Sequence, residues 1–76
     1  MKEILKTIIE SLVDDIESIE ITETENDKTV ELQVKISKDD MGKVIGKQGK
    51  TANAIRTIMK SVAGKDNKKI SIEFVD

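Results

Sequence analysis

A glycine-bounded segment, Gly46 to Gly49, interrupts a helical pattern that otherwise runs from Lys38 to Ala63. Glycine reaches positive φ at low cost and lets a second backbone approach closely, so this segment favours a tight turn. The pattern therefore predicts a short helix over about residues 38–45, the turn, and a second helix over about residues 50–63. The 76 residues are enough for one small domain that contains this pair of helices.

Apolar spacing defines four further elements. Residues 2–15 carry apolar side chains at helical spacing and predict an amphipathic helix. Residues 18–25, 29–37 and 70–75 alternate apolar and polar side chains and predict strands, the first two joined into an antiparallel hairpin by a turn cluster at residues 25–28. The two helices between the second and third strands form a crossover, which permits parallel pairing of those strands.

The resulting element order is α-β-β-α-α-β, in a single domain over residues 1–76. The apolar face of a three-stranded sheet needs cover, and the helices supply it from one side. The sequence therefore predicts a two-layer α+β fold, with a three-stranded sheet and helices on one face.

Polar residues mark the expected helix ends. Ser37-x-x-Asp40 fits a capping box that satisfies amide groups at the start of the short helix. Gly64 is placed to end the second helix in the left-handed conformation. The pairs Asp14-Asp15 and Asp39-Asp40 are interpreted as solvated helix ends and caps rather than as catalytic carboxylates.

Charge is segregated along the chain, although the total is only −2. Residues 1–41 sum to −7, residues 42–69 to +7 and residues 70–76 to −2. An anionic partner responds to the local field rather than to the total charge, so the segment around the turn is a candidate anion-binding surface. The alternative is that these lysines only solvate a helix face.

The spacing around the turn disfavours nucleotide hydrolysis. Gly49-Lys50-Thr51 resembles the end of a P-loop, but the first glycine of that motif belongs at the position of Val44. The chain has no histidine and no cysteine, which removes the commonest general base, the commonest metal ligand and any thiolate nucleophile. We therefore expect no enzymatic activity, no cofactor and no metal site.

The turn suits a phosphate backbone better. The second helix directs its N-terminal amides and the positive end of its dipole toward the turn, which attracts phosphate. Lys47 and Lys50 add positive charge, and Gln48 offers hydrogen-bond donors and an acceptor. These features predict a grip on an anionic polymer that does not read its sequence. A plain connection between helices, in which the glycines only relieve strain, is the alternative.

The run VIGKQGKTANAI, residues 44–55, resembles the V-I-G-x-x-G-x-x-x-x-x-I signature of KH domains, and the element order resembles the type II KH arrangement. The longer run MGKVIGKQGKTANAIRTIM, in so short a chain, resembles the KhpA family of small bacterial proteins with a single KH domain. The resemblance covers nearly the whole chain. It implies binding of about four nucleotides of single-stranded RNA or DNA, with the backbone over G-x-x-G and the bases in an apolar groove.

Position by position, the resemblance implies which residues form the RNA-binding site. The loop residues are Gly46, Lys47, Gln48 and Gly49, and the flanking cations are Lys43, Lys50 and Arg56. The aliphatic positions of the signature, which suit the core as well as the groove, are Val44, Ile45 and Ile55. The one aromatic residue, Phe74, is expected on the inward face of the last strand, so bases have no aromatic platform and one module should bind weakly.

The resemblance also implies partners. Proteins of the KhpA family are RNA chaperones or regulators that form homodimers, pair with a larger KH-containing partner, KhpB, and are linked to cell-envelope and cell-length control. On a helical wheel, Ile58 and Ala54 widen the apolar arc of the second helix, so they are predicted to form a subunit contact. Packing of Ile58 on the N-terminal helix is the alternative. A dimer places two grooves on one RNA and raises avidity.

Other interpretations of the chain stay open at this level. A KH-shaped protein-interaction module without RNA binding fits the acidic first half, and single-stranded DNA is an alternative ligand. The N-terminal run MKEILKTIIESLVDD is too charged for a signal peptide, and no apolar run approaches the roughly 18 residues of a membrane span. We therefore expect a cytoplasmic protein that does not enter the membrane.

Overall fold

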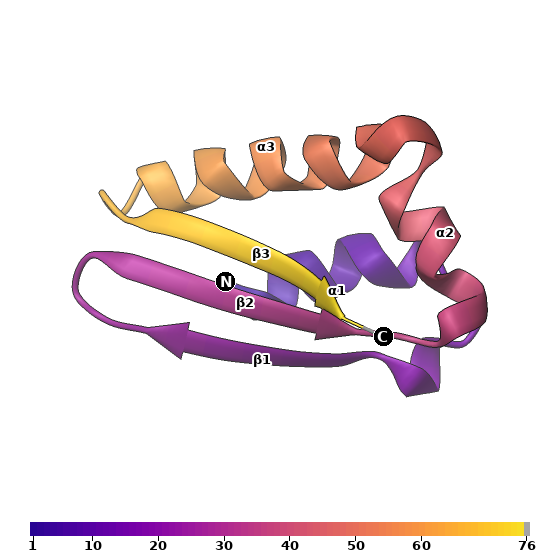
Figure 1. Cartoon of the computed structure of the whole chain (residues 1–76). Coiled ribbons are helices and arrows are strands. Elements are labelled where there is room, and N and C mark those ends of the chain that lie inside the picture. Colours follow the sequence, from indigo (N-terminus) through magenta and orange to yellow (C-terminus); the bar gives the residue numbers. More distant parts are fainter. Residues whose placement is uncertain (76) are drawn as a thin grey trace.

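A three-stranded sheet with the order β1-β2-β3 forms one layer and helices form the other, in a computed structural model that describes residues 1–75 (Figure 1). The main elements are α1 (Lys2–Glu10), β1 (Glu20–Glu25), β2 (Thr29–Lys35), α2 (Met41–Ile45), α3 (Lys50–Gly64) and β3 (Lys69–Val75). Short 3-10 helices occupy Ile16–Ser18, Lys38–Asp40 and Lys47–Gly49. The predicted α+β fold with the order α-β-β-α-α-β, the arrangement of a type II KH domain, is therefore confirmed.

Strand β2 is the centre of the sheet because it pairs on both sides. It runs antiparallel to β1, with Val34 opposite Ile21, and parallel to β3, with Leu32 beside Ile72. The predicted hairpin and the predicted parallel pairing are both confirmed. The hairpin strands are slightly shorter than expected, since one 3-10 helix lies before β1 and another after β2.

The hydrophobic core lies between the sheet and the helices. Val30, Leu32 and Val34 alternate along β2 toward the helical layer and are almost completely buried. The buried side chains that meet them from α1 and α3 are Leu5, Ile9, Ile55 and Met59. Burying one such side chain is worth about 1.5–3 kcal/mol relative to leaving it exposed, so this set holds the two layers together. None of the helices within residues 1–75 is long and apolar enough to cross a membrane.

Helix α1 ends at Glu10, earlier than the predicted residue 15. Turn-type hydrogen bonds to the carbonyl of Ile9 follow it. The next two backbone N–H groups, of Asp14 and Asp15, then donate to the carboxylate of Asp40 rather than to the helix. Hydrogen bonds to the distant Asp40 carboxylate thus replace those that would continue the helix. Apolar periodicity cannot predict such a tertiary contact.

The predicted capping box at the start of the short helix is wrong. The Ser37 side chain makes no capping hydrogen bond, and the Asp40 side chain points to the segment after α1. Asp40 is only 3% exposed, so the interpretation of this carboxylate as a solvated cap is also corrected. Two backbone amides that need an acceptor draw Asp40 away from the local helix.

The predicted left-handed cap at Gly64 is wrong as well. The left-handed residue is Asn67, with φ 57°. The N–H of Lys68 donates to the carbonyl of Ala63 at 3.0 Å, and the N–H of Asn67 donates to the carbonyl of Gly64 at 3.1 Å. These two bonds form a Schellman motif, so the last turn of α3 runs past the glycine before it closes.

Helix α2 lies at the end of the sheet at which β2 and β3 finish (Figure 1). It has 5 residues and leads through the glycine turn into α3, which runs back over the sheet. This path places the turn at the N-terminal end of α3 and places β3, an edge strand, along the same helix.

Candidate nucleic-acid interface

The turn between α2 and α3 contains three residues with positive φ. Gly46 has φ 75° and ψ 175°, a region that is essentially restricted to glycine, and Gly49 has φ 75° and ψ 11°. The positive φ expected of the two glycines is confirmed. Gln48 also lies in the left-handed region, with φ 58° and ψ 26°. This conformation costs a residue with a side chain roughly 1–2 kcal/mol, so the flanking turn must hold Gln48 in place.

Gly46 is required by space as well as by its backbone angles. A Cβ at this position would lie 2.7 Å from Cβ of Thr51 and 2.9 Å from its backbone nitrogen, with the Thr51 hydroxyl closer still. The first turn of α3 therefore packs directly on the backbone of Gly46. At Gly49, no atom of residues 1–75 lies within 4 Å of such a Cβ, so only its φ favours glycine.

The start of α3 presents positive charge and backbone donors. Its N-cap residue is Gly49, and no side chain within residues 1–75 caps the helix. Lys47, Gln48 and Lys50 are exposed around it. In this part of the chain no carboxylate forms an ion pair with either lysine. The N-terminal amides and dipole of a 15-residue helix thus lie beside two exposed lysines, an arrangement that suits an anion.

A groove of about 190 Å³ follows the same helix toward the edge of the sheet. It lies between α3 and β3, and its lining residues are Arg56, Lys60, Ile70, Ser71 and Ile72. Its walls thus combine two cationic side chains, four residues apart on one helix, with aliphatic side chains of an edge strand. Of these five, only Arg56 was predicted for the site. Alternation along the last strand puts Ile70 and Ile72 on the same face as Phe74, but it carries no information about which helix flanks this edge strand.

Arg56 bridges the groove. Its Nε donates to the carbonyl of Ile72 at 3.4 Å, and its Nη1 donates to Oδ1 of Asn53 at 3.3 Å. Its guanidinium carbon lies 5.5 Å from the centre of the Phe74 ring, within the range of a cation–π interaction. Arg56 therefore stacks on Phe74, the one aromatic side chain of the protein.

The aliphatic positions of the predicted site divide between the core and the surface. Val44 is fully buried and Ile55 almost so, and both belong to the hydrophobic core. For Val44 this is the core alternative that the sequence left open, since a fully buried side chain supports the turn from beneath. Ile45 is half-buried immediately before Gly46.

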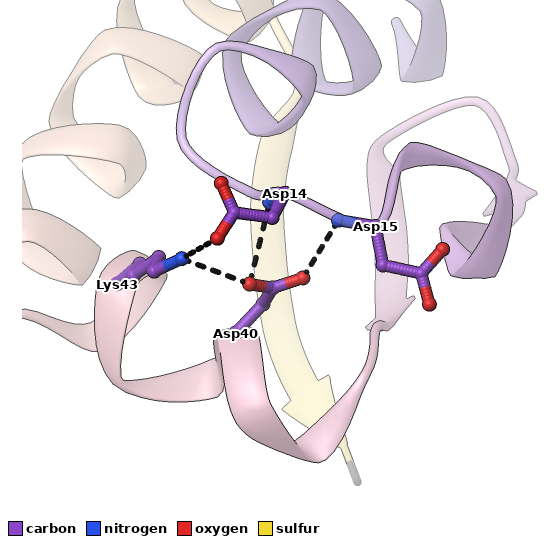
Figure 2. A network of polar contacts seen from close by, with 4 residues as sticks. All are labelled: Asp14, Asp15, Asp40 and Lys43. Carbon is purple, nitrogen blue, oxygen red and sulfur yellow. Dashed lines mark hydrogen bonds and ion pairs between the residues drawn. The ribbon is translucent and has the colours of Figure 1, made fainter.

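Lys43 is engaged elsewhere. Its ammonium group forms ion pairs with the carboxylates of Asp14 and Asp40, on the side of α2 that faces the segment after α1 (Figure 2). Hydrogen bonds to these two carboxylates raise the pKa of Lys43 above its ordinary value. Lys47, Lys50 and Arg56 are thus gathered at the turn and groove, whereas Lys43 has anionic partners within the protein.

The predicted subunit-contact residues lie on the surface of α3. Ile58 is 49% exposed, and Ala54 is exposed one turn before it. Ile58 is not among the buried residues of the core, so its packing on the N-terminal helix is at most partial. Ile4 of α1 is a second large apolar side chain with substantial exposure, at 44%.

Comparisons with known proteins agree on one family. The family model described as "KhpA/KhpB, KH domain" matches residues 2–74. The protein named "RNA-binding protein KhpA" from Clostridium perfringens is 47% identical over 75 residues, which cover 99% of this chain and 100% of the relative. Proteins of the same name from Clostridium acetobutylicum, 44% identical with the same coverage, and Listeria monocytogenes, 43% identical over both full lengths, are similar too. No solved structure gives a significant match.

Proposed function

Because this chain belongs to the KhpA/KhpB family of KH domains, we propose that it binds single-stranded RNA, with the turn Gly46–Gly49 against the RNA backbone and the bases in the groove between α3 and β3. The observation that carries the proposal is the turn itself. Its two glycines and Gln48 hold positive φ, and it leads into an α3 start that, within residues 1–75, has no side-chain cap. Lys47 and Lys50 flank it, and neither forms an ion pair in this described part of the chain.

Each part of the site has a defined task in this proposal. The N–H groups at the start of α3, with Lys47 and Lys50, neutralise and orient phosphates. Gln48, held outward by its strained backbone, donates hydrogen bonds to the sugar–phosphate chain. Ile70 and Ile72 offer the bases an aliphatic wall in place of the aromatic platforms of other single-strand binders.

RNA is the favoured nucleic acid because the relatives carry RNA-binding names. By family, the protein is proposed to act as an RNA chaperone or post-transcriptional regulator in the cytoplasm. Single-stranded DNA is the alternative ligand, and competition between an RNA and a DNA oligonucleotide of the same sequence separates the two.

A dimer completes the proposal, because one groove without aromatic stacking binds weakly and two linked grooves gain avidity. Ile58, with Ala54, supplies the subunit contact, either with a second copy or with a KhpB-type partner. Ile58→Asp places a charge in this contact and should convert a sedimenting dimer into a folded monomer, whereas Thr57→Asp, at the adjacent exposed position, should not. A wild-type protein that sediments as a monomer at all concentrations contradicts the homodimer.

The proposed grip is tested by the double substitution Lys47→Asp and Gln48→Asp. It sets negative charge against phosphate and removes no core atom, and aspartate tolerates the left-handed region at position 48. Affinity for a short oligouridylate should fall at least about tenfold. The dependence of log K on log salt should become shallower by roughly 0.7 for each phosphate that the variant no longer neutralises.

A matched control makes the same chemical change elsewhere. The control variant, Gln33→Asp with Lys35→Asp, replaces the same two residue types on the exposed face of β2 and changes the net charge by the same amount. This control should change the affinity far less. Equal losses of affinity in the two variants would show that net charge, and not the turn, governs binding.

A protein-interaction module is the second candidate, favoured by the net charge of −7 in residues 1–41 and by Ile16, which is 47% exposed among acidic neighbours. Ultraviolet crosslinking in cells separates the two functions, because only the first predicts RNA covalently recovered with the protein. Crosslinked RNA that disappears in the Lys47→Asp, Gln48→Asp variant favours the RNA-binding function.

A further inference from the structure

Asp40 is buried where a hydrophobic or neutral residue would be expected. Among residues 1–75 it is the one charged side chain that is buried, at 3% exposed. Its Oδ2 accepts the backbone N–H of Asp15 at 3.0 Å, and its Oδ1 accepts the backbone N–H of Asp14 at 3.3 Å (Figure 2). The ammonium group of Lys43 lies 3.2 Å from the same Oδ1 and also contacts the Asp14 carboxylate.

These contacts form a clasp, a name used here for Asp40, Lys43, the Asp14 carboxylate and the backbone amides of residues 14 and 15. A carboxylate removed from water needs partners for its charge and its lone pairs, and the clasp supplies both. Hydrogen bonds from the Asp15 and Asp14 amides, with the Lys43 charge, hold the pKa of Asp40 below its ordinary value. The Asp15 side chain takes no part, since it points away and accepts a bond from the Ser18 hydroxyl.

The clasp joins two segments that are 25 residues apart in the chain. One is the exit from α1, and the other is the 3-10 helix and α2, which end at the glycine turn. Helix α2 has only 5 residues, too few to hold its own conformation or position without tertiary support. It packs mainly on α3 and on the 3-10 helices beside it. Val44 secures its inner side, and the clasp secures its outer side.

Lys43 stands three residues before Gly46, so any movement of α2 about its inner contact moves the turn. Loss of the clasp releases the outer side of α2 while the core at Val44 persists. The turn then samples several orientations relative to the start of α3, and only the fraction of molecules in the wild-type orientation binds RNA, with the same phosphate contacts as before.

We propose that Asp40 and Lys43 are positioning residues for the RNA grip, which they orient by tying α2 to the segment after α1, and that Lys43 does not itself bind phosphate. This inference rests on the proposed function of the turn. It gives Lys43 a role different from that of Lys47 and Lys50, although all three lysines lie in the same basic stretch of the sequence.

Salt dependence distinguishes a phosphate contact from a positioning residue. A lysine that contacts phosphate releases a counterion, so its removal makes the salt dependence of affinity shallower by roughly 0.7, whereas removal of a positioning residue lowers affinity at every salt concentration alike. The experiment compares Lys43→Met, Asp40→Asn and Lys47→Met, three uncharged replacements of similar length. Binding of a fluorescein-labelled oligouridylate is measured over a salt series, below the unfolding temperature of every variant.

Lys47→Met should reduce both the affinity for RNA and the slope of log K against log salt concentration. Lys43→Met and Asp40→Asn should lower affinity by about tenfold, the loss expected when the turn holds its binding orientation about one-tenth of the time, with the wild-type salt dependence retained. In both variants, the amide chemical shifts of residues 46–49 should differ from those of the wild type, while the amide shifts of the sheet stay unchanged.

Two results overturn the inference. A slope reduced as much in Lys43→Met as in Lys47→Met overturns it, because Lys43 is then a phosphate ligand. Wild-type affinity in folded Lys43→Met or Asp40→Asn overturns it too, because the clasp is then only structural. If Asp40→Asn does not fold, Lys43→Met decides alone, since this side chain is 44% exposed and its loss leaves the amide bonds to Asp40 in place. An unchanged Lys47→Met variant counts instead against the proposed function of the turn.

Discussion

Replacing Gly46 by alanine should destabilise the protein more than the same change at any of its other three glycines. The residue has φ 75° and ψ 175°, where a non-glycine residue costs about 1–3 kcal/mol. The added Cβ also overlaps with Thr51, at 2.7 Å from its Cβ and 2.9 Å from its backbone nitrogen. A backbone atom cannot turn aside as a flexible side chain does, so overpacking adds about 1–3 kcal/mol. The expected total is roughly 2–6 kcal/mol.

Such a loss is large for a domain of this size. A chain of 76 residues has a stability of about 4–11 kcal/mol on the usual scale per residue. Urea unfolding followed by circular dichroism measures the change directly. With a slope of about 1 kcal/mol per molar urea, the unfolding midpoint of Gly46→Ala should fall by about 2 M or more. At the upper end of the expected destabilisation, the variant is largely unfolded without denaturant.

The other glycines are built-in controls. Gly49→Ala meets an open space and incurs only the left-handed penalty of about 1–2 kcal/mol. Gly42→Ala and Gly64→Ala have ordinary helical φ and nothing within 4 Å, so they should be neutral or stabilise the protein by about 0.4–1 kcal/mol. If Gly46→Ala costs no more than Gly49→Ala, the close approach of α3 to Gly46 is refuted.

Two further predictions concern the corrected helix ends. Because the pKa of Asp40 is lowered in the folded protein, its contribution to stability is present above the unfolded value of about 3.9 and is lost as the pH falls through the folded value. Thermal unfolding between about pH 6 and about pH 2 should therefore show a smaller acid-dependent loss in Asp40→Asn than in wild type, and identical curves would contradict this. Asn67→Gly should keep or raise stability, whereas Asn67→Ala should lower it by about 1 kcal/mol, because φ at this position is 57°. Chemical unfolding of the pair measures the difference, and equal midpoints would count against a Schellman cap at Asn67.

Much of the fold could be predicted because its information is local. Val30, Leu32 and Val34 alternate within one strand, and Ile55 and Met59 repeat within one helix, so each pattern reports its own burial. The glycine turn was predictable for the same reason, since Gly46 and Gly49 carry the required backbone angles themselves.

The rest depends on partners distant in the chain. Asp40 fits a local cap with Ser37, and only the folded arrangement brings the amides of residues 14 and 15 within its reach. Lys43 and Lys47 look alike in the sequence, yet one is paired with two carboxylates and the other is exposed and unpaired within residues 1–75. The groove likewise requires α3 to lie along β3, a choice of neighbour that no short pattern encodes.

Amide chemical-shift mapping during titration with a short oligouridylate tests most directly whether the turn and groove bind RNA. The largest changes should fall on residues 46–50 and continue along the groove through Arg56 and residues 70–72, while β1 stays unaffected. Changes that cluster on β1 or on the exposed face of the sheet, with none at residues 46–50, would contradict the proposed RNA grip.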